Sequence, residues 1–303
     1  MTWTGLIYRL RQGGARAAFA ATVIQAFARL AVSQPPRIGL SAVVVGRNDD
    51  YMPDFGQRLR ATIGWNLRWL ADEIVFVEWN PLPDRPLLAP GLAREFPRVR
   101  AFVVDPHVHR EVGGNAKVPV LEFHAKNAGI RRCSREWILA TNADALVGPD
   151  TVLRVRGRSL SPGAALTARR IDIPWREQRS RAASVLDTLW YRRVIPDHSL
   201  GTGEFLLAHR ELWHRAGGYD ESSARHRIGI DKRGTAQLLA IGGQADRAGL
   251  VFHLAHPTSC TEGVQDHHGE CAGVEGVPYV SPPSWGLEGR QETPLGERVW
   301  VIR

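Results

Sequence analysis

Three features are scarce in this 303-residue sequence: cysteine, dense runs of basic residues and long apolar runs. The three cysteines, Cys133, Cys260 and Cys271, are odd in number and form no CxxC pair, which argues against a disulfide framework and favours a reducing compartment. No run of roughly 18 apolar residues is free of polar interruptions, so no membrane-spanning helix is predicted. With 44% hydrophobic and 23% charged residues, the composition excludes the disordered and collagen-like classes.

The chain is basic, but its basic residues are scattered. Lys and Arg number 39 against 31 Asp and Glu, which gives a formal charge of +8. No dense Lys/Arg run marks a nucleic-acid surface, so we predict no nucleic-acid partner. Attraction for phosphorylated sugars, nucleotides or an anionic membrane explains the excess equally well.

Residues 1–36 form a basic N-terminal segment, because the first acidic residue in the chain is Asp49. Within 15–32, polar and apolar side chains fall on opposite faces of a helix. Such a helix either packs on the following domain or lies on an anionic membrane through residues 1–32. The predicted location is cytoplasmic, with peripheral attachment to the inner face of the membrane as the alternative.

From residue 40 onward, apolar runs alternate with stretches of helical spacing. A continuous apolar run typical of a buried parallel strand spans 40–46, and further strands are predicted at 73–79, 99–104 and 137–141. Helices are predicted over 55–70 and 122–133. This alternation predicts an α/β fold with a mostly parallel central sheet flanked by helices.

Polar residues follow three of these strands, at 47–50, 78–80 and 142–144. In an open parallel sheet these ends lie along one edge, which is where such sheets bind ligands. The second half is less regular, with strands expected at 164–171, 203–208 and 251–254 and a helix at 231–241. We expect one domain over 37–257, with a donor half (37–150) and an acceptor half (151–257), followed by an irregular wrap over 258–303.

The ordered motifs RNDD, EIVFVEWN, AKNAGIRR, WILATNAD, GEFLLAHRELWHRAGGYDE, IGID and HLAHP carry a family resemblance. Over residues 40–257 the sequence resembles GT-A fold glycosyltransferases, similar to the inverting family-2 enzymes. The resemblance implies transfer of a sugar from a nucleotide-diphosphate sugar to a hydroxyl of a glycan, a lipid-linked molecule or a small molecule.

The resemblance also implies roles for particular residues. Asn142 and Asp144 occupy the Asp-x-Asp positions, and Asp144, with His256 as a further ligand, would hold Mn²⁺ or Mg²⁺ against the donor diphosphate. Asn142 replaces the first Asp of the motif, so the site has one charge fewer. Asp231 aligns with the catalytic base, and Glu204 is its rival. The expected nucleotide contacts are Arg47, Asn48, Asp49, Glu78, Lys126, Asn127 and Asn142.

Other interpretations stay open. Asp144 is alternatively a turn acid, and Asp231 is alternatively an acid at an ordinary helix start. A zinc site could be formed by His253, His256, Cys260, His267, His268 and Cys271, although their spacing matches no known ligand pattern. A nucleotidyltransferase would need a Gly-rich basic phosphate loop after the first strand, where this chain has the acidic RNDDYMPD. A catalytically silent nucleotide-sugar or carbohydrate binder is the third alternative.

Overall fold

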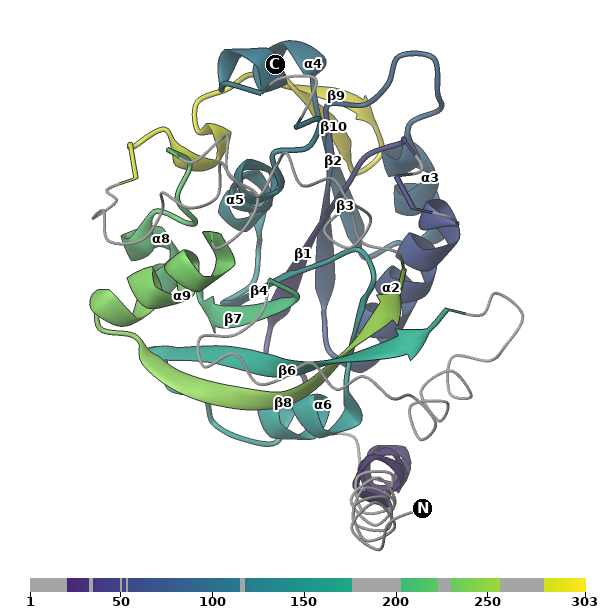
Figure 1. Cartoon of the computed structure of the whole chain (residues 1–303), viewed down its shortest axis with the longest axis vertical. Helices are drawn as coiled ribbons and strands as arrows, with labels where there is room; N and C mark the ends of the chain where they lie inside the picture. Colours follow the sequence, from purple (N-terminus) through teal and green to yellow (C-terminus); the bar gives the residue numbers. More distant parts are fainter. Residues whose placement is uncertain are drawn as a thin grey trace, which may run out of the picture.

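The computed structural model describes residues 21–32, 35–49, 51–52, 54–114, 118–175, 203–222, 230–256 and 281–303. In this part of the chain one ten-stranded sheet has the order β5-β8-β6-β7-β4-β1-β2-β3-β10-β9 (Figure 1). The strands are β1 (Leu40–Gly46), β2 (Glu73–Trp79), β3 (Val99–Val104), β4 (Trp137–Thr141), β5 (Ala145–Val147), β6 (Ala164–Pro174), β7 (Phe205–His209), β8 (Gln244–Ala255), β9 (Glu292–Gly296) and β10 (Val299–Ile302).

Helices cover both faces of this sheet. They are α2 (Phe55–Trp69), α3 (Leu88–Glu95), α4 (Pro106–Glu111), α5 (Glu122–Arg132), α6 (Pro149–Arg156), α8 (Arg210–Ala216) and α9 (Ile230–Ala240), with a short 3-10 helix η4 (Trp285–Leu287). Five of the nine neighbouring strand pairs are parallel, including all those within β4-β1-β2-β3-β10. The predicted α/β class, with a mostly parallel sheet flanked by helices, is confirmed.

The alternation of side chains along β1 explains why both faces are covered. Val43 and Val45 point into one core with α5, α8 and α9, whereas Ala42 and Val44 point into the other with α2, α3 and α6. Figure 1 shows α5 on one side of β1 and β2, and α2 and α3 on the other. A strand buried on both faces is predominantly apolar, which is why β1 lacks the hydrophobic–polar alternation of a sheet with one exposed face.

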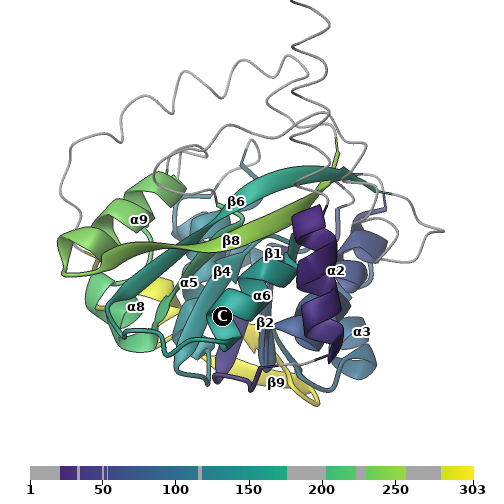
Figure 2. The same ribbon diagram turned by 90° about the horizontal axis from the view of Figure 1, so that it is seen from below.

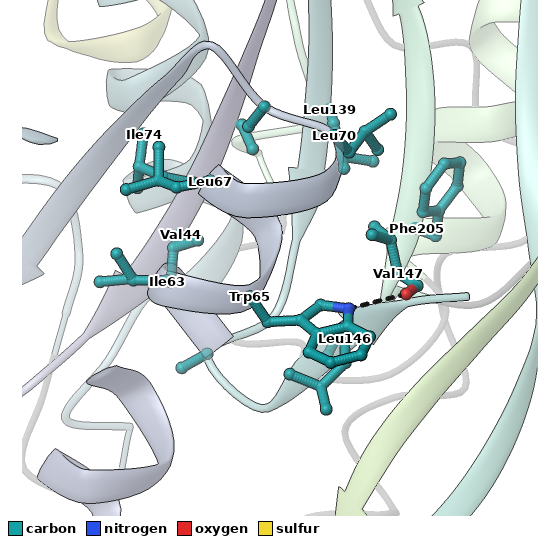
Figure 3. Packing of buried hydrophobic residues seen from close by; sticks show 14 of the residues in the cluster. Val44, Ile63, Trp65, Leu67, Leu70, Ile74, Leu139, Leu146, Val147 and Phe205 are labelled. Carbon is teal, nitrogen blue, oxygen red and sulfur yellow. Dashed lines mark hydrogen bonds between the residues drawn. The ribbon is translucent and has the colours of Figure 1, made fainter. Parts of the chain in front are cut away.

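The core below α2 is built around Trp65. Its indole N–H donates to the Val147 carbonyl at 2.9 Å, and Figure 3 shows the ring beside Leu146. The helical residues 21–32 pack on the same region, because Val23 and Leu30 are buried and Phe27 meets Trp65 edge to face. Within the described ranges, every helix is too short or too polar to span a lipid bilayer.

The strands of the second half differ from the sequence prediction in length. β6 continues to Pro174 and β8 begins at Gln244, whereas the apolar runs predict 164–171 and 251–254. Both strands extend through charged residues, and Figure 2 shows them running side by side across the molecule. Charges such as Arg170 and Asp172 are tolerated inside the sheet because they pair with each other.

The C-terminal residues also differ from the prediction. Instead of an irregular wrap, residues 292–302 form the hairpin β9–β10, and β10 pairs in parallel with β3. Val299 and Ile302 are buried, and Trp300 stacks on Phe102 with ring centroids 5.1 Å apart. Short strands such as these escape sequence analysis because their stabilisation comes from a partner strand far along the chain.

Candidate active site

The candidate site begins at Asp144, the last residue of the short connection between β4 and β5. The short strand β5 follows and pairs with β8 so that Ala145 lies opposite His253. This register brings three side chains together: Asp144 Oδ2 lies 3.3 Å from His253 Nε2 and 3.0 Å from His256 Nε2. Asp144 is only 4% exposed, so its charge depends on these partners.

Asp144, His253 and His256 are suited to hold a divalent metal ion. One ligand atom from each can be chosen so that all lie within 4.8 Å of one another. Burial alone would raise the pKa of Asp144, but the two histidines outweigh it and hold this pKa far below its usual range. Burial lowers the pKa of His253, yet Asp144 and Asp172 outweigh it and raise the value to about 9. A buried carboxylate balanced by two imidazoles is the kind of site where a cation replaces protons.

A second layer of charges lies behind His253. Its Nδ1 is 3.0 Å from Asp172 Oδ1, and β6 and β8 place these two residues opposite each other. Arg170 Nε contacts the same Asp172 oxygen at 2.7 Å, and its Nη1 pairs with Glu204. The sequence prediction contains neither Arg170 nor Asp172. The one indication of these two residues in the sequence is that they stand two positions apart in a strand, so that their side chains share a face of the sheet.

Lys126 connects β4 to the start of β7. It is fully buried, and its Nζ donates to Asn142 Oδ1 at 2.8 Å and to the Gly203 carbonyl at 3.0 Å. Glu122 Oε1 lies 2.7 Å away as its ionic partner. The carbonyl oxygen of Asn142 is therefore already engaged by Lys126. The predicted contacts of Lys126 and Asn142 with a nucleotide stay predictions.

The two predicted catalytic carboxylates, those of Asp231 and Glu204, lie close to Gly203, whose carbonyl accepts a hydrogen bond from Lys126. Gly203 precedes Glu204, and a Cβ atom built on Gly203 would lie 3.6 Å from Asp231 Oδ2. Burial raises the pKa of Asp231, Lys126 opposes this shift, and the charge of Glu204 adds to it. One carboxylate oxygen of Glu204 forms an ion pair with Arg170.

The residues after β1 and β2 fasten neighbouring loops. Arg47 donates from Nε to the Asn80 carbonyl at 2.6 Å and pairs with Asp49 at 2.9 Å. Asn48 accepts from the Leu82 N–H at 2.7 Å and donates to nearby carbonyls. Within the described part of the chain, Asp49 Oδ1 is buried without a hydrogen-bond partner, which leaves an acceptor for a ligand.

Glu78 and Asn127 are engaged inside the fold. The carboxylate of Glu78 accepts from the N–H groups of Leu88 and Ala89 at the start of α3, and burial raises its pKa to about 7. Asn127 is fully buried and exchanges hydrogen bonds with the backbone of Tyr219 at 2.7 and 2.8 Å. Both side chains hold elements together, and their expected nucleotide contacts stay predictions.

The alternative zinc site is only partly within the described residues. Cys260, His267, His268 and Cys271 lie outside them. His253 and His256, the two members that are described, meet Asp144.

No protein-family model matches the sequence, and no curated protein is significantly similar to it. Among solved structures, the chain is similar to glucosyl-3-phosphoglycerate synthase of M. tuberculosis, with 11% identity, a TM-score of 0.44 and coverage of 83% of this chain and 80% of that one. It is similar to the inositol-1-phosphate CTP transferase of T. maritima, with 13% identity, a TM-score of 0.44 and coverage of 78% and 97%. It is also similar to mannosyl-3-phosphoglycerate synthase of Rubrobacter xylanophilus, with 16% identity, a TM-score of 0.40 and coverage of 77% and 71%.

Proposed function

We propose that this protein is a glycosyltransferase that moves a sugar from a nucleotide-diphosphate sugar to a hydroxyl acceptor. The observation that carries the proposal is the meeting of Asp144, His253 and His256 at the end of β4, with ligand atoms within 4.8 Å of one another. In a sheet whose parallel strands end along this edge, a metal site is suited to hold a diphosphate.

In this proposal the three residues bind Mn²⁺ or Mg²⁺. When bound, the ion would neutralise negative charge on the departing nucleoside diphosphate. Arg47 and Asp49 lie after β1, where the free Oδ1 of Asp49 suits a ribose hydroxyl or a base N–H. Lys126 keeps β4 and the segment before β7 together through Asn142 and Gly203, so it fixes the distance between donor and acceptor sides.

We assign the role of general base to Asp231. Inverting transfer needs a group that takes the proton of the acceptor hydroxyl as that oxygen attacks the anomeric carbon. Burial raises the pKa of Asp231 and makes it a better proton acceptor than an exposed aspartate. Glu204 is the weaker choice because Arg170 already occupies one of its oxygens.

Two alternatives predict different measurements. A silent binder would bind the nucleotide sugar without turnover. A nucleotidyltransferase would take a nucleoside triphosphate and release pyrophosphate, but the loop after β1 contains Asp49 rather than a Gly-rich basic sequence.

Calorimetric titration of UDP, GDP and their sugars, with and without Mn²⁺, tests the proposal. We expect metal-dependent binding of one nucleotide by the wild type and its loss in Asp144→Ala. Asp246→Ala is the matched control, because Asp246 pairs with Arg154 at the other end of β8. Sugar release or transfer by the wild type would then separate an enzyme from a silent binder. If no nucleotide binds under any condition, the donor site is wrongly assigned.

A further inference from the structure

His253 has a different carboxylate partner on each of its two ring nitrogens, while Arg170 Nη2 lies 2.8 Å from Nδ1 and 3.4 Å from Nε2. Nε2 faces Asp144 Oδ2 at 3.3 Å, while Nδ1 lies 3.0 Å from Asp172 Oδ1. The side chains of His253 and Asp172 are 5% and 10% exposed, so water does not replace these contacts freely. In metal sites a carboxylate on the far nitrogen commonly sets the ring orientation and the tautomer of a histidine ligand.

Arg170 competes for the same ring nitrogen. Its Nη2 lies 2.8 Å from His253 Nδ1, and it can donate there only when Nδ1 carries no proton. A neutral ring would then carry its proton on Nε2, toward Asp144. A metal ion on Nε2 requires the opposite tautomer, with the proton on Nδ1. Among the contacts described for Nδ1, Asp172 is the one that accepts this proton.

The other contacts of Arg170 are compatible with the His253 tautomer that carries its proton on Nδ1. Its Nε is held by Asp172 at 2.7 Å and its Nη1 by Glu204, so the guanidinium has carboxylate partners without the histidine. Asp172 thus orients Arg170 as well as His253. Because β6 and β8 pair with Asp172 opposite His253, the arrangement is built into the sheet and not into a loop.

The resulting donor set is rich in nitrogen. Asp144 supplies oxygen, whereas His253 and His256 supply two imidazoles. Asn142, which could have added an oxygen, has its carbonyl held by Lys126 at 2.8 Å. Imidazole nitrogen binds first-row transition ions, of which Mn²⁺ is the weakest binder, more tightly than it binds Mg²⁺, which favours carboxylate, carbonyl and water oxygens.

We propose that Asp172 is a positioning residue that fixes His253 as the second imidazole ligand, and that it thereby makes the site select Mn²⁺ over Mg²⁺. This inference rests on the proposed function in taking Asp144, His253 and His256 as the metal ligands. It adds the ion that is selected and the residue that enforces the selection.

The test is titration of the metal-stripped 303-residue protein with Mn²⁺ alone and Mg²⁺ alone, without nucleotide. We expect the wild type to bind Mn²⁺ more tightly than Mg²⁺. Asp172→Ala should weaken Mn²⁺ binding by about 10- to 100-fold and change Mg²⁺ binding much less, so that the selectivity falls. Asp246→Asn, which breaks an Arg–Asp pair elsewhere on β8, should leave both affinities unchanged.

Pulsed electron paramagnetic resonance of bound Mn²⁺ provides a second readout that simple loss of stability would not move. We expect couplings from two imidazole nitrogens in the wild type and from one in Asp172→Ala and His253→Ala. Asp172→Asn has nearly the same shape and keeps an acceptor oxygen, so it should retain the second coupling with reduced affinity. It also serves if Asp172→Ala does not fold.

The inference is overturned if the wild type binds no Mn²⁺, if it binds Mg²⁺ at least as tightly, or if the Asp172 variants keep wild-type affinity, selectivity and nitrogen couplings. Since no nucleotide is present, a protein that behaves as expected here but binds no nucleotide sugar would refute the proposed function alone. Nucleotide binding with unchanged metal selectivity in Asp172→Ala would refute this inference alone.

Discussion

Asp231 and Glu204 are carboxylates in one neighbourhood with different partners. Glu204 is paired with Arg170, which is itself part of the charge group behind His253. Asp231 stands in the first turn of α9, where burial raises its pKa and Lys126 lowers it. A base must lose its proton before it can act, so a raised pKa places the onset of activity at higher pH than for an exposed aspartate.

We predict that Asp231→Asn lowers kcat by about 10²- to 10⁴-fold while nucleotide-sugar affinity stays within about threefold of the wild-type value. In the wild type, activity should rise with pH through the raised pKa of Asp231, and this acidic limb should be absent from the residual activity of the variant. Steady-state rates between pH 4 and 9 and parallel calorimetry would measure both effects. Glu204→Gln is the comparison, and a larger loss of kcat in that variant would move the base to Glu204.

At the level of single residues, the sequence indicates the site only in part. Asp144 and His256 are expected to be metal ligands from the resemblance to GT-A glycosyltransferases, and the structure places their side chains 3.0 Å apart. The contact of Asp172 with His253 could not be predicted, since the two residues are 81 positions apart in the sequence and meet only through the register of β6 and β8. The two adjacent arginines at 169–170 likewise give no indication of their ion-pair partners until that register is known.

At the level of elements, the glycine inside α5 has a packing reason. A Cβ atom on Gly129 would stand 2.4 Å from Val43 Cγ1 and 3.3 Å from Val77 Cγ2. The helix therefore approaches β1 and β2 more closely than any residue with a side chain would permit. That approach sets the position of Lys126 one turn earlier, and through it the position of Asn142.

Gly129→Ala should destabilise the protein by about 1–3 kcal/mol, even though alanine is the better helix former. Val43 is β-branched and buried in a parallel strand, so it cannot move aside at low cost. Urea unfolding followed by circular dichroism would measure the change. Gly91→Ala in α3, whose new Cβ would meet only Arg60 Nη2 at 3.7 Å, is the control and should not lose stability. Equal effects at the two positions would contradict the packing argument.

The amount of uninterrupted apolar sequence in a strand explains whether its bounds could be predicted from the sequence. Strands β1, β2, β3 and β4 match their predicted bounds because each contains an unbroken apolar stretch of at least four residues that is buried on both faces of the sheet. Strands β6 and β8 contain charged residues along much of their length and pair with each other, and β10 has only four residues. The local hydrophobic pattern alone therefore underestimates the number and length of the strands in the second half of the sequence.

At the level of the whole molecule, segments from both ends of the described chain pack onto the α/β domain, one on the sheet and one on α2. The strand β10 extends the sheet beyond β3, and Arg131 and Arg132 of α5 bond to backbone carbonyls of η4 at 2.7 and 2.8 Å. The helical residues 21–32 cover Trp65 with their apolar face. Their polar face, which includes Arg29, is exposed.

This packing separates the two roles predicted for the N-terminal helix. If its apolar face belongs to the core, Leu30→Ala should lower the free energy of unfolding by about 2–4 kcal/mol, because Leu30 is 1% exposed and its removal leaves a cavity. Arg29→Gln, on the exposed face, should change that free energy by less than about 0.5 kcal/mol. Chemical denaturation measures both variants. Co-sedimentation with anionic phosphatidylserine vesicles adds the opposing outcome: if Leu30→Ala unfolds like the wild type but no longer sediments with vesicles, the apolar face binds the membrane and not the core.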